Sequence, residues 1–151
     1  MPLVTVLEGE VDTAQPGVDL KYPSVTSCMT VTVVFDNGLM LGGHAVRVPT
    51  ENQRSPAQIL EELNHRIQAM REASPAKLWV LGDLGGWTPQ FASADQDVSA
   101  AVGEDGQREQ ELGDYVTQQL GLDDNIEHTV AQALGDIQFA GGFDGDLTPE
   151  W

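Results

Sequence analysis

The sequence predicts a single α+β domain over residues 1–151, in which a mixed or antiparallel sheet or sandwich core is flanked by helices. Three observations support this fold class. An alternating hairpin pattern occupies residues 30–48, apolar residues at helical spacing follow it, and no repeat or linker divides the chain. A chain of 151 residues can also bury one hydrophobic core without disulfides.

The first part of the chain favours strands. A short strand is expected at Leu3–Leu7, where β-branched residues are concentrated, and a polar, turn-prone stretch over residues 8–17 ends it. Apolar residues then alternate with threonines over residues 30–35, up to an Asn37-Gly38 pair that is typical of a type I′ turn. Residues 40–48 form the second strand of this predicted hairpin.

A helix is expected after the hairpin. Ser55 as N-cap, Pro56 in the first helical position and Gln58 three residues after the cap form a capping-box arrangement. Ser74-Pro75 stops the helix, and the next strand is expected at Leu78–Leu81. The apolar stripe of the helix consists of Ile59, Leu60, Leu63, Ile67 and Met70.

The second half predicts an acidic loop and two helices. Residues 92–106 are small, polar and acidic, which is typical of a mobile loop. The first helix ends at Gly121, and the second begins at Asp124 with Glu127 three residues later. The two apolar stripes are Leu112, Tyr115, Val116 and Leu120, and then Ile126, Val130, Ala133, Leu134 and Ile137.

The charge of the chain is strongly negative, with 24 acidic and 7 basic side chains and a net charge of −17. Residues 78–151 carry −14 of this charge, whereas residues 1–77 carry −3. Acid-rich segments usually form a solvated surface. Because seven scattered cations do not form a patch that attracts phosphate backbones or anionic lipid, nucleic acid and membrane surfaces are not expected partners.

The single cysteine, Cys28, excludes an intramolecular disulfide and a cysteine cluster for zinc. Asp95-Gln96-Asp97 and Asp144-Gly145-Asp146 suggest calcium loops, but neither continues with the glycine and distal glutamate that such a loop needs. The sequence therefore supports no metal site, and no cofactor is expected. The first residues lack the basic segment and apolar run of a signal peptide, and no stretch reaches the roughly 18 apolar residues of a spanning helix. We therefore expect a protein that is cytoplasmic, or exported without a cleavable signal peptide.

One histidine differs from the other two in its surroundings. His65 and His128 each lie opposite the apolar stripe of a predicted helix, which indicates surface positions. His44 lies inside an apolar strand directly after Gly42-Gly43, and Cys28 lies just ahead of the partner strand. The hairpin therefore brings a thiol and an imidazole into the same region of the sheet.

The pairing of the hairpin decides whether these two side chains meet. A turn on Asn37-Gly38 pairs residues whose numbers sum to 75, so Cys28 and His44 point to opposite faces of the sheet. A bulge at Gly42-Gly43 would bring the two side chains to one face. A Cys28 that precedes the regular strand would do the same.

A Cys/His pair supports acyl transfer on an amide or ester. The thiolate is the nucleophile, and the imidazole lowers the thiol pKa and returns a proton to the leaving group. The backbone N–H groups of Ser27 and Cys28 are candidate donors to the oxyanion that forms during the reaction. The alternative interpretation is that Cys28 and His44 are buried core residues that catalyse no reaction.

Residues 22–49 resemble the core of the chemoreceptor glutamine deamidases and the cytotoxic necrotising factor deamidase toxins. The similarity lies in Thr26-Ser27-Cys28, the β-branched strand after it, and Gly42-Gly43-His44 sixteen residues after the cysteine. The resemblance implies an α/β fold built around a β-sandwich. It also implies a Cys/His pair on neighbouring strands that hydrolyses a glutamine side-chain amide of a protein to glutamate and ammonia.

The resemblance assigns roles to individual residues. It makes Cys28 the nucleophile and His44 the general base and acid. The family often has a threonine six residues before the cysteine as an orienting group, and this position is Tyr22 here. The backbone carbonyl of Tyr22, or alternatively Ser24, could orient His44, and Thr26 stands where the chemoreceptor branch has glycine.

The leading hypothesis is a thiol-dependent amide hydrolase, and more specifically a protein glutamine deamidase of effector, toxin or chemotaxis type. Its expected partner is a protein substrate, and the negative charge favours one with a basic surface. The alternative is a non-catalytic acidic adaptor or neutralising protein, in which Cys28 and His44 are only core residues.

Overall fold

A computed structural model describes residues 3–47, 49–83, 105–123, 125–141 and 149–151. Within these residues the chain alternates between strands and two helices. In chain order the elements are β1 (Leu3–Thr5), β2 (Val11–Ala14), β3 (Asp19–Val25), β4 (Met29–Phe35), β5 (Met40–Ala45), α1 (Pro56–Ala69), β6 (Pro75–Gly82), α2 (Asp105–Gln119), β7 (Glu127–Gln132) and β8 (Gly135–Phe139).

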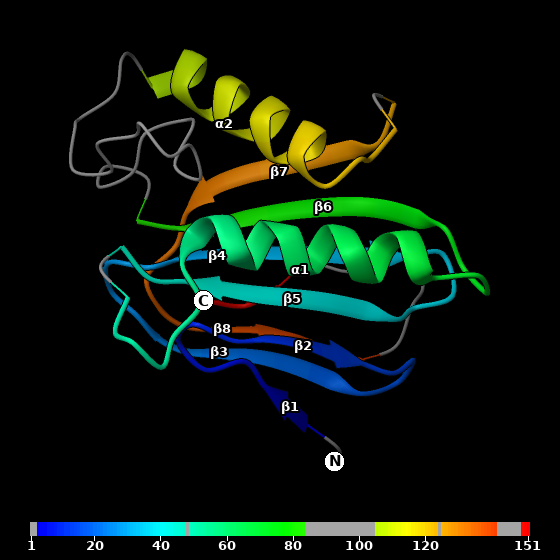
Figure 1. The fold of residues 1–151 in the computed structure, drawn as a ribbon, viewed down its shortest axis with the longest axis horizontal. Coiled ribbons are helices and arrows are strands. Elements are labelled where there is room, and N and C mark those ends of the chain that lie inside the picture. Colours follow the sequence, from blue (N-terminus) through cyan, green and yellow to red (C-terminus); the bar gives the residue numbers. More distant parts are fainter. Residues whose placement is uncertain (1–2, 48, 84–104, 124, 142–148) are drawn as a thin grey trace.

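The strands form two sheets, and both helices pack on one of them. The larger sheet has the order β2-β5-β4-β6-β7 and is antiparallel except for the β6–β7 pair. Figure 1 shows α1 lying along β4 and β5, and α2 lying beside β7. The smaller sheet has the order β1-β3-β8 and packs on the other face of the larger sheet. The predicted α+β fold class is confirmed.

Each strand of the large sheet contributes to two hydrophobic cores, because successive side chains point to opposite faces. The odd-numbered residues of β4 face the helices, and its even-numbered residues face the small sheet. The helix-side core includes Val31, Val33, Phe35, Ile59, Leu63 and Val116. The core between the sheets includes Leu20, Tyr22, Cys28, Val34, Met40, Trp79, Ile137 and Phe139.

The two helices show the predicted caps. At the start of α1, the Ser55 hydroxyl accepts a bond from the Gln58 N–H at 3.2 Å, and the Gln58 side chain accepts one from the Ser55 N–H at 2.9 Å. The end of α2 carries Gly121 at φ 66°, where its N–H donates to Gln118 and the N–H of Leu122 donates to Thr117. This bond pair is a Schellman motif, for which glycine is the favoured residue.

The β4–β5 hairpin exists, but its register differs from the prediction by one residue. Paired residues sum to 74, so Thr30 lies opposite His44. The Phe35 N–H donates to Leu39 at 2.8 Å, which closes a three-residue loop. Within this loop only Gly38 has a positive φ, at 90°. The turn is therefore a type I turn with a glycine bulge rather than a two-residue type I′ turn.

Two other predictions about elements are wrong. The stretch 8–17, expected to be irregular, contains β2, and the helix expected after Asp124 is replaced by β7 and β8. In that region Ile126 and Val130 pack on the helix-side core, whereas Ala133 and Ile137 lie between the sheets. The apolar residues serve two cores in turn, and this division produced an apparent helical spacing.

His128 consequently does not lie on the outer side of a helix. It lies in β7 and is half-buried. A Cβ placed on Gly113 of α2 would be only 2.6 Å from its ring, so His128 packs under that helix. His65 is exposed on α1, as predicted.

Of the predicted acidic loop over residues 92–106, residues 92–104 lie outside the described residues, and residues 105–106 begin α2. Among the described helices, none is long and apolar enough to cross a membrane.

Candidate functional site

The structure brings Cys28 and His44 together and adds Glu8 to them. A ring nitrogen of His44, the sulfur of Cys28 and a carboxylate oxygen of Glu8 all lie within 4.8 Å of one another. Cys28 directly precedes β4, His44 lies in β5, and Glu8 lies in the turn between β1 and β2. Three segments that are distant in sequence therefore supply one cluster of thiol, imidazole and carboxylate.

The observed register explains why the two predicted residues share a face. Thr30 pairs with His44, and Cys28 lies two positions before Thr30, so both side chains point into the layer between the sheets. Cys28 is 2% exposed and His44 is fully buried. The bulge that the predicted register required is not needed.

Gly42 and Gly43, where that bulge was expected, serve packing. A Cβ on Gly42 would collide with the Tyr22 hydroxyl, and a Cβ on Gly43 would lie 2.7 Å from Ile59. Both glycines pair regularly with β4. They allow Tyr22 on one face of the sheet and α1 on the other face to approach the backbone of β5 closely.

The backbone of residues 6–10 holds His44 in place. The Nδ1 atom of His44 lies 2.9 Å from the carbonyl oxygen of Val6, and a neutral imidazole bonded in this way donates its Nδ1–H. The N–H of Gly9 donates to the His44 carbonyl at 2.8 Å, and the N–H of His44 donates to Glu10 at 3.0 Å. Nε2 is then the free nitrogen, and it is buried with no hydrogen-bond partner among the described residues.

The orienting carbonyl therefore comes from Val6 and not from Tyr22 or Ser24. Tyr22 contacts His44 through its ring, edge-on, with the ring centroids 5.7 Å apart. Its hydroxyl bonds to Thr32 Oγ1 at 2.6 Å. The backbone N–H of Ser24 donates to Asp136 at 2.9 Å. Tyr22 thus forms a wall of the site without using its backbone to orient the imidazole.

Burial and the Glu8 carboxylate together set the protonation of the thiol. Burial is the larger cause and the Glu8 charge the next, and they raise the pKa of Cys28 from 9.0 to about 11. Hydrogen bonds from Ser27 to the sulfur act in the opposite direction. At neutral pH the group is therefore a thiol rather than a thiolate.

The imidazole is also neutral at this pH. Burial lowers the pKa of His44 below 6.5, although the Val6 carbonyl and the Glu8 charge partly offset the effect. A neutral thiol thus lies beside a neutral imidazole whose Nε2 is a free acceptor. Nε2 has no hydrogen-bond partner among the described residues, so the thiol is not bonded to it in this structure. Transfer of the thiol proton to nitrogen as the sulfur attacks an electrophile requires the two groups to approach each other.

The backbone at Ser27 and Cys28 is partly engaged. The Ser27 N–H bonds to the Cys28 sulfur, and the Cys28 carbonyl accepts a bond from the Asp83 N–H at 3.0 Å. Of the two predicted oxyanion donors, the N–H of Cys28 remains the candidate.

Glu8 was not predicted from the sequence, because it lies in a turn twenty residues before Cys28 and belongs to no recognisable spacing.

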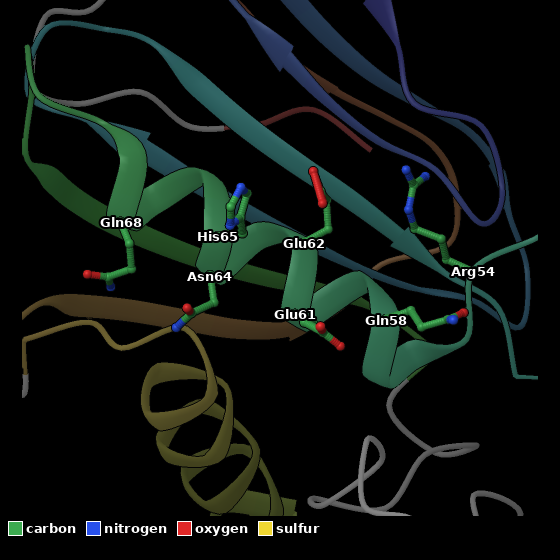
Figure 2. A pocket seen from close by; sticks show the side chains of 7 residues that line it. All are labelled: Arg54, Gln58, Glu61, Glu62, Asn64, His65 and Gln68. Carbon is green, nitrogen blue, oxygen red and sulfur yellow. The ribbon is translucent and has the colours of Figure 1, made fainter.

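A pocket lies apart from this cluster, on the helical side of the large sheet. It has a volume of about 580 Å³, and Figure 2 shows its lining side chains projecting from α1 and from Arg54 just before it. Asn64 in this pocket donates to the carbonyl of Gln119 at 3.2 Å, which ties α1 to the end of α2. The lining residues are polar and include no thiol: Arg54, Gln58, Glu61, Glu62, Asn64, His65 and Gln68.

No protein-family model matches the chain, and no curated protein matches it. The interpretation of the site therefore depends on its geometry and chemistry.

Proposed function

We propose that this protein is a thiol-dependent amide hydrolase, and specifically a protein glutamine deamidase of effector, toxin or chemotaxis type. The observation that carries the proposal is the pairing of Cys28 and His44 on one face of the sheet, with Nδ1 of His44 held by the Val6 carbonyl. This bond directs the other ring nitrogen to act as a base.

The reaction begins from neutral groups. As the Cys28 sulfur attacks the side-chain amide carbon of glutamine, Nε2 of His44 accepts the thiol proton. The tetrahedral oxyanion accepts a bond from the Cys28 N–H. His44 then gives its proton to the departing nitrogen, which leaves as ammonia, and a thioester remains on the sulfur.

Water completes the reaction. His44 removes a proton from a water molecule that attacks the thioester, and the sulfur leaves and recovers that proton as a thiol. Glutamine has become glutamate, one water has been consumed and one ammonia has been released. The lowered pKa of His44 suits this role, because the imidazole remains a free base at neutral pH.

The exposed Glu8 is on the side from which substrate would enter. The sulfur and imidazole are buried, whereas Glu8 of the same cluster is exposed. A narrow, uncharged glutamine amide suits such a route, because entry of a charged side chain beside the carboxylate and buried thiol would cost desolvation. The net charge of −17 favours a target protein with a basic surface around that glutamine.

Substitution of the two reacting residues tests the proposal. We expect Cys28→Ser to abolish glutamine-to-glutamate conversion and His44→Asn to reduce it by about 10²- to 10⁴-fold. His65→Asn is the matched control, because His65 is exposed on α1 and lines the pocket there, away from Cys28 and His44. Ammonia release that survives in Cys28→Ser would show that the thiol is not the nucleophile.

The alternative function is a non-catalytic acidic binding protein. The near-complete burial of Cys28 and His44 favours it, because a core pair needs no access. In that case Cys28→Ala would leave binding to a basic partner unchanged, and no glutamine of that partner would be converted.

A further inference from the structure

We propose that Glu8, Cys28 and His44 bind a divalent zinc-type cation, and that the cation blocks the thiol. The inference concerns the regulation of the site in the proposed function, but the binding itself does not depend on catalysis. The three donor atoms lie within 4.8 Å of one another. In a tetrahedral zinc site with bonds of about 2.0–2.3 Å, neighbouring ligand atoms are roughly 3.3–3.8 Å apart, so the three donor atoms need to approach one another by at most about 1.0–1.5 Å.

The hydrogen bonding of His44 matches that of a metal ligand. Zinc-bound histidines donate the other ring N–H to a carboxylate or a backbone carbonyl, and here Nδ1 bonds to the Val6 carbonyl at 2.9 Å. Nε2 is buried and lacks a hydrogen-bond partner among the described residues. A buried nitrogen without a hydrogen-bond partner lowers the stability of the fold, and a bound cation would give Nε2 a partner.

The charge around Glu8 also favours a cation. In the part of the chain that the structure describes, no lysine or arginine forms an ion pair with Glu8. Its carboxylate lies beside a thiol, and both would become ligands of a divalent cation. Binding replaces the thiol proton, so that the sulfur coordinates as a thiolate and one proton enters solvent.

The donor set selects the class of metal. One sulfur, one imidazole nitrogen and one carboxylate oxygen suit zinc, whereas calcium and magnesium prefer sites made only of oxygen. Three protein ligands leave a fourth position, which a water molecule fills on the exposed side next to Glu8. Occupied in this way, Cys28 is no longer a nucleophile and His44 is no longer a base, so the cation inhibits the proposed reaction.

The experiment uses the full chain after treatment with a chelator. Zinc titration followed by calorimetry should give one tight site per chain. Cobalt(II), as a spectroscopic substitute, should give a thiolate-to-cobalt charge-transfer band and the visible bands of a tetrahedral site. Cys28→Ser should lose the charge-transfer band, and Glu8→Gln should weaken zinc binding at least tenfold.

Two variants serve as matched controls. Glu10→Gln changes an exposed carboxylate of the same turn that is not in the cluster, and His65→Asn changes an exposed histidine. Neither should change the tight site. Circular dichroism of each variant tests whether it is folded, so that a loss of binding can be distinguished from a loss of folding.

The possible outcomes separate this inference from the proposed function. Zinc binding that is unaffected by both Glu8→Gln and Cys28→Ser, or cobalt binding without a thiolate band, overturns the metal site. If zinc does not bind but metal-free protein converts glutamine, the metal site is wrong and the deamidase stands. If zinc binds as described but metal-free protein converts no glutamine, the metal site stands and the deamidase is wrong.

Discussion

The protonation of Cys28 results from its immediate surroundings more than from its place in the hairpin. Burial raises its pKa most, and the Glu8 carboxylate raises it further. His44 in turn is kept neutral by burial. The pair therefore resembles a resting serine–histidine arrangement, in which the proton moves only during attack, more than a preformed thiolate–imidazolium pair.

Glu8→Gln should make the thiol more reactive. Removing the negative charge lowers the pKa of Cys28 from about 11, although burial keeps it from falling to that of a solvated thiol. Each unit by which the pKa falls raises the thiolate population about tenfold at neutral pH. The pH dependence of alkylation by iodoacetamide, in metal-free protein, measures this change. An alkylation rate equal to that of Glu10→Gln would contradict the role of Glu8.

The pH dependence of catalysis should follow the depressed pKa of His44. A group with a lowered pKa stays deprotonated as the pH falls below 6.5, so the base remains available there. We expect kcat/KM of the metal-free protein to hold below pH 6.5 and to decline only at more acidic pH. An acidic limb centred at or above 6.5 would mean that His44 titrates like a solvated imidazole.

At the scale of the element, two helix predictions are confirmed and one is wrong, although all three combined a signal at a helix end with apolar spacing. The capping box of α1 and the glycine that ends α2 are chemical signals within a few residues, and both are confirmed. The helix prediction for residues 126–137 was wrong because Ile126 and Val130 pack on the helix-side core, whereas Ala133 and Ile137 lie between the sheets. The hairpin register was wrong by one because the loop holds three residues, with Gly38 as its bulge.

The close approach of β5 to β3 across the two sheets can be tested at Gly42. A Cβ there would collide with the Tyr22 hydroxyl and lie 3.0 Å from Leu20 Cδ2. Gly42→Ala should therefore destabilise the protein by about 1–3 kcal/mol in urea unfolding. Tyr22→Phe should partly relieve this cost in the double variant, because it removes the nearest atom. Fully additive effects of the two substitutions would contradict the contact.

The contact between β3 and β8 at Asp136 should stabilise the fold at neutral pH and lose this effect in acid. The Asp136 carboxylate accepts a bond from the Ser24 N–H at 2.9 Å and lies 3.6 Å from Lys21 Nζ, and these two contacts lower its pKa below 3.8. A lowered carboxyl pKa stabilises the fold above 3.8, and the effect is lost as the pH falls through the lower, folded value. Asp136→Asn should therefore be less stable than wild type at neutral pH. Urea unfolding measures the difference in unfolding free energy between wild type and Asp136→Asn, and a difference that is as large in strong acid as at neutral pH would contradict this account.

At the scale of the whole molecule, the site is a product of topology. The parallel pairing of β1 with β3 carries the chain over the end of β5, where Val6 and Glu8 reach His44. The sequence identified Cys28 and His44 from residue type and nearness in one hairpin. It could not identify Val6, because any residue type can supply a backbone carbonyl. It could not identify Glu8, because no local sequence pattern predicts the long-range pairing of β1 with β3 that brings Glu8 to His44.

The most direct test of the central claim is a proteome-wide comparison of glutamine conversion. A cell extract is incubated with metal-free wild type or with Cys28→Ser, and peptides are searched for the gain of about one dalton that replaces an amide NH₂ by OH. The account predicts converted glutamines on basic proteins with wild type, and none above background with Cys28→Ser. The same set of converted sites with both proteins, including an empty set, would contradict the claim that Cys28 and His44 form a deamidase.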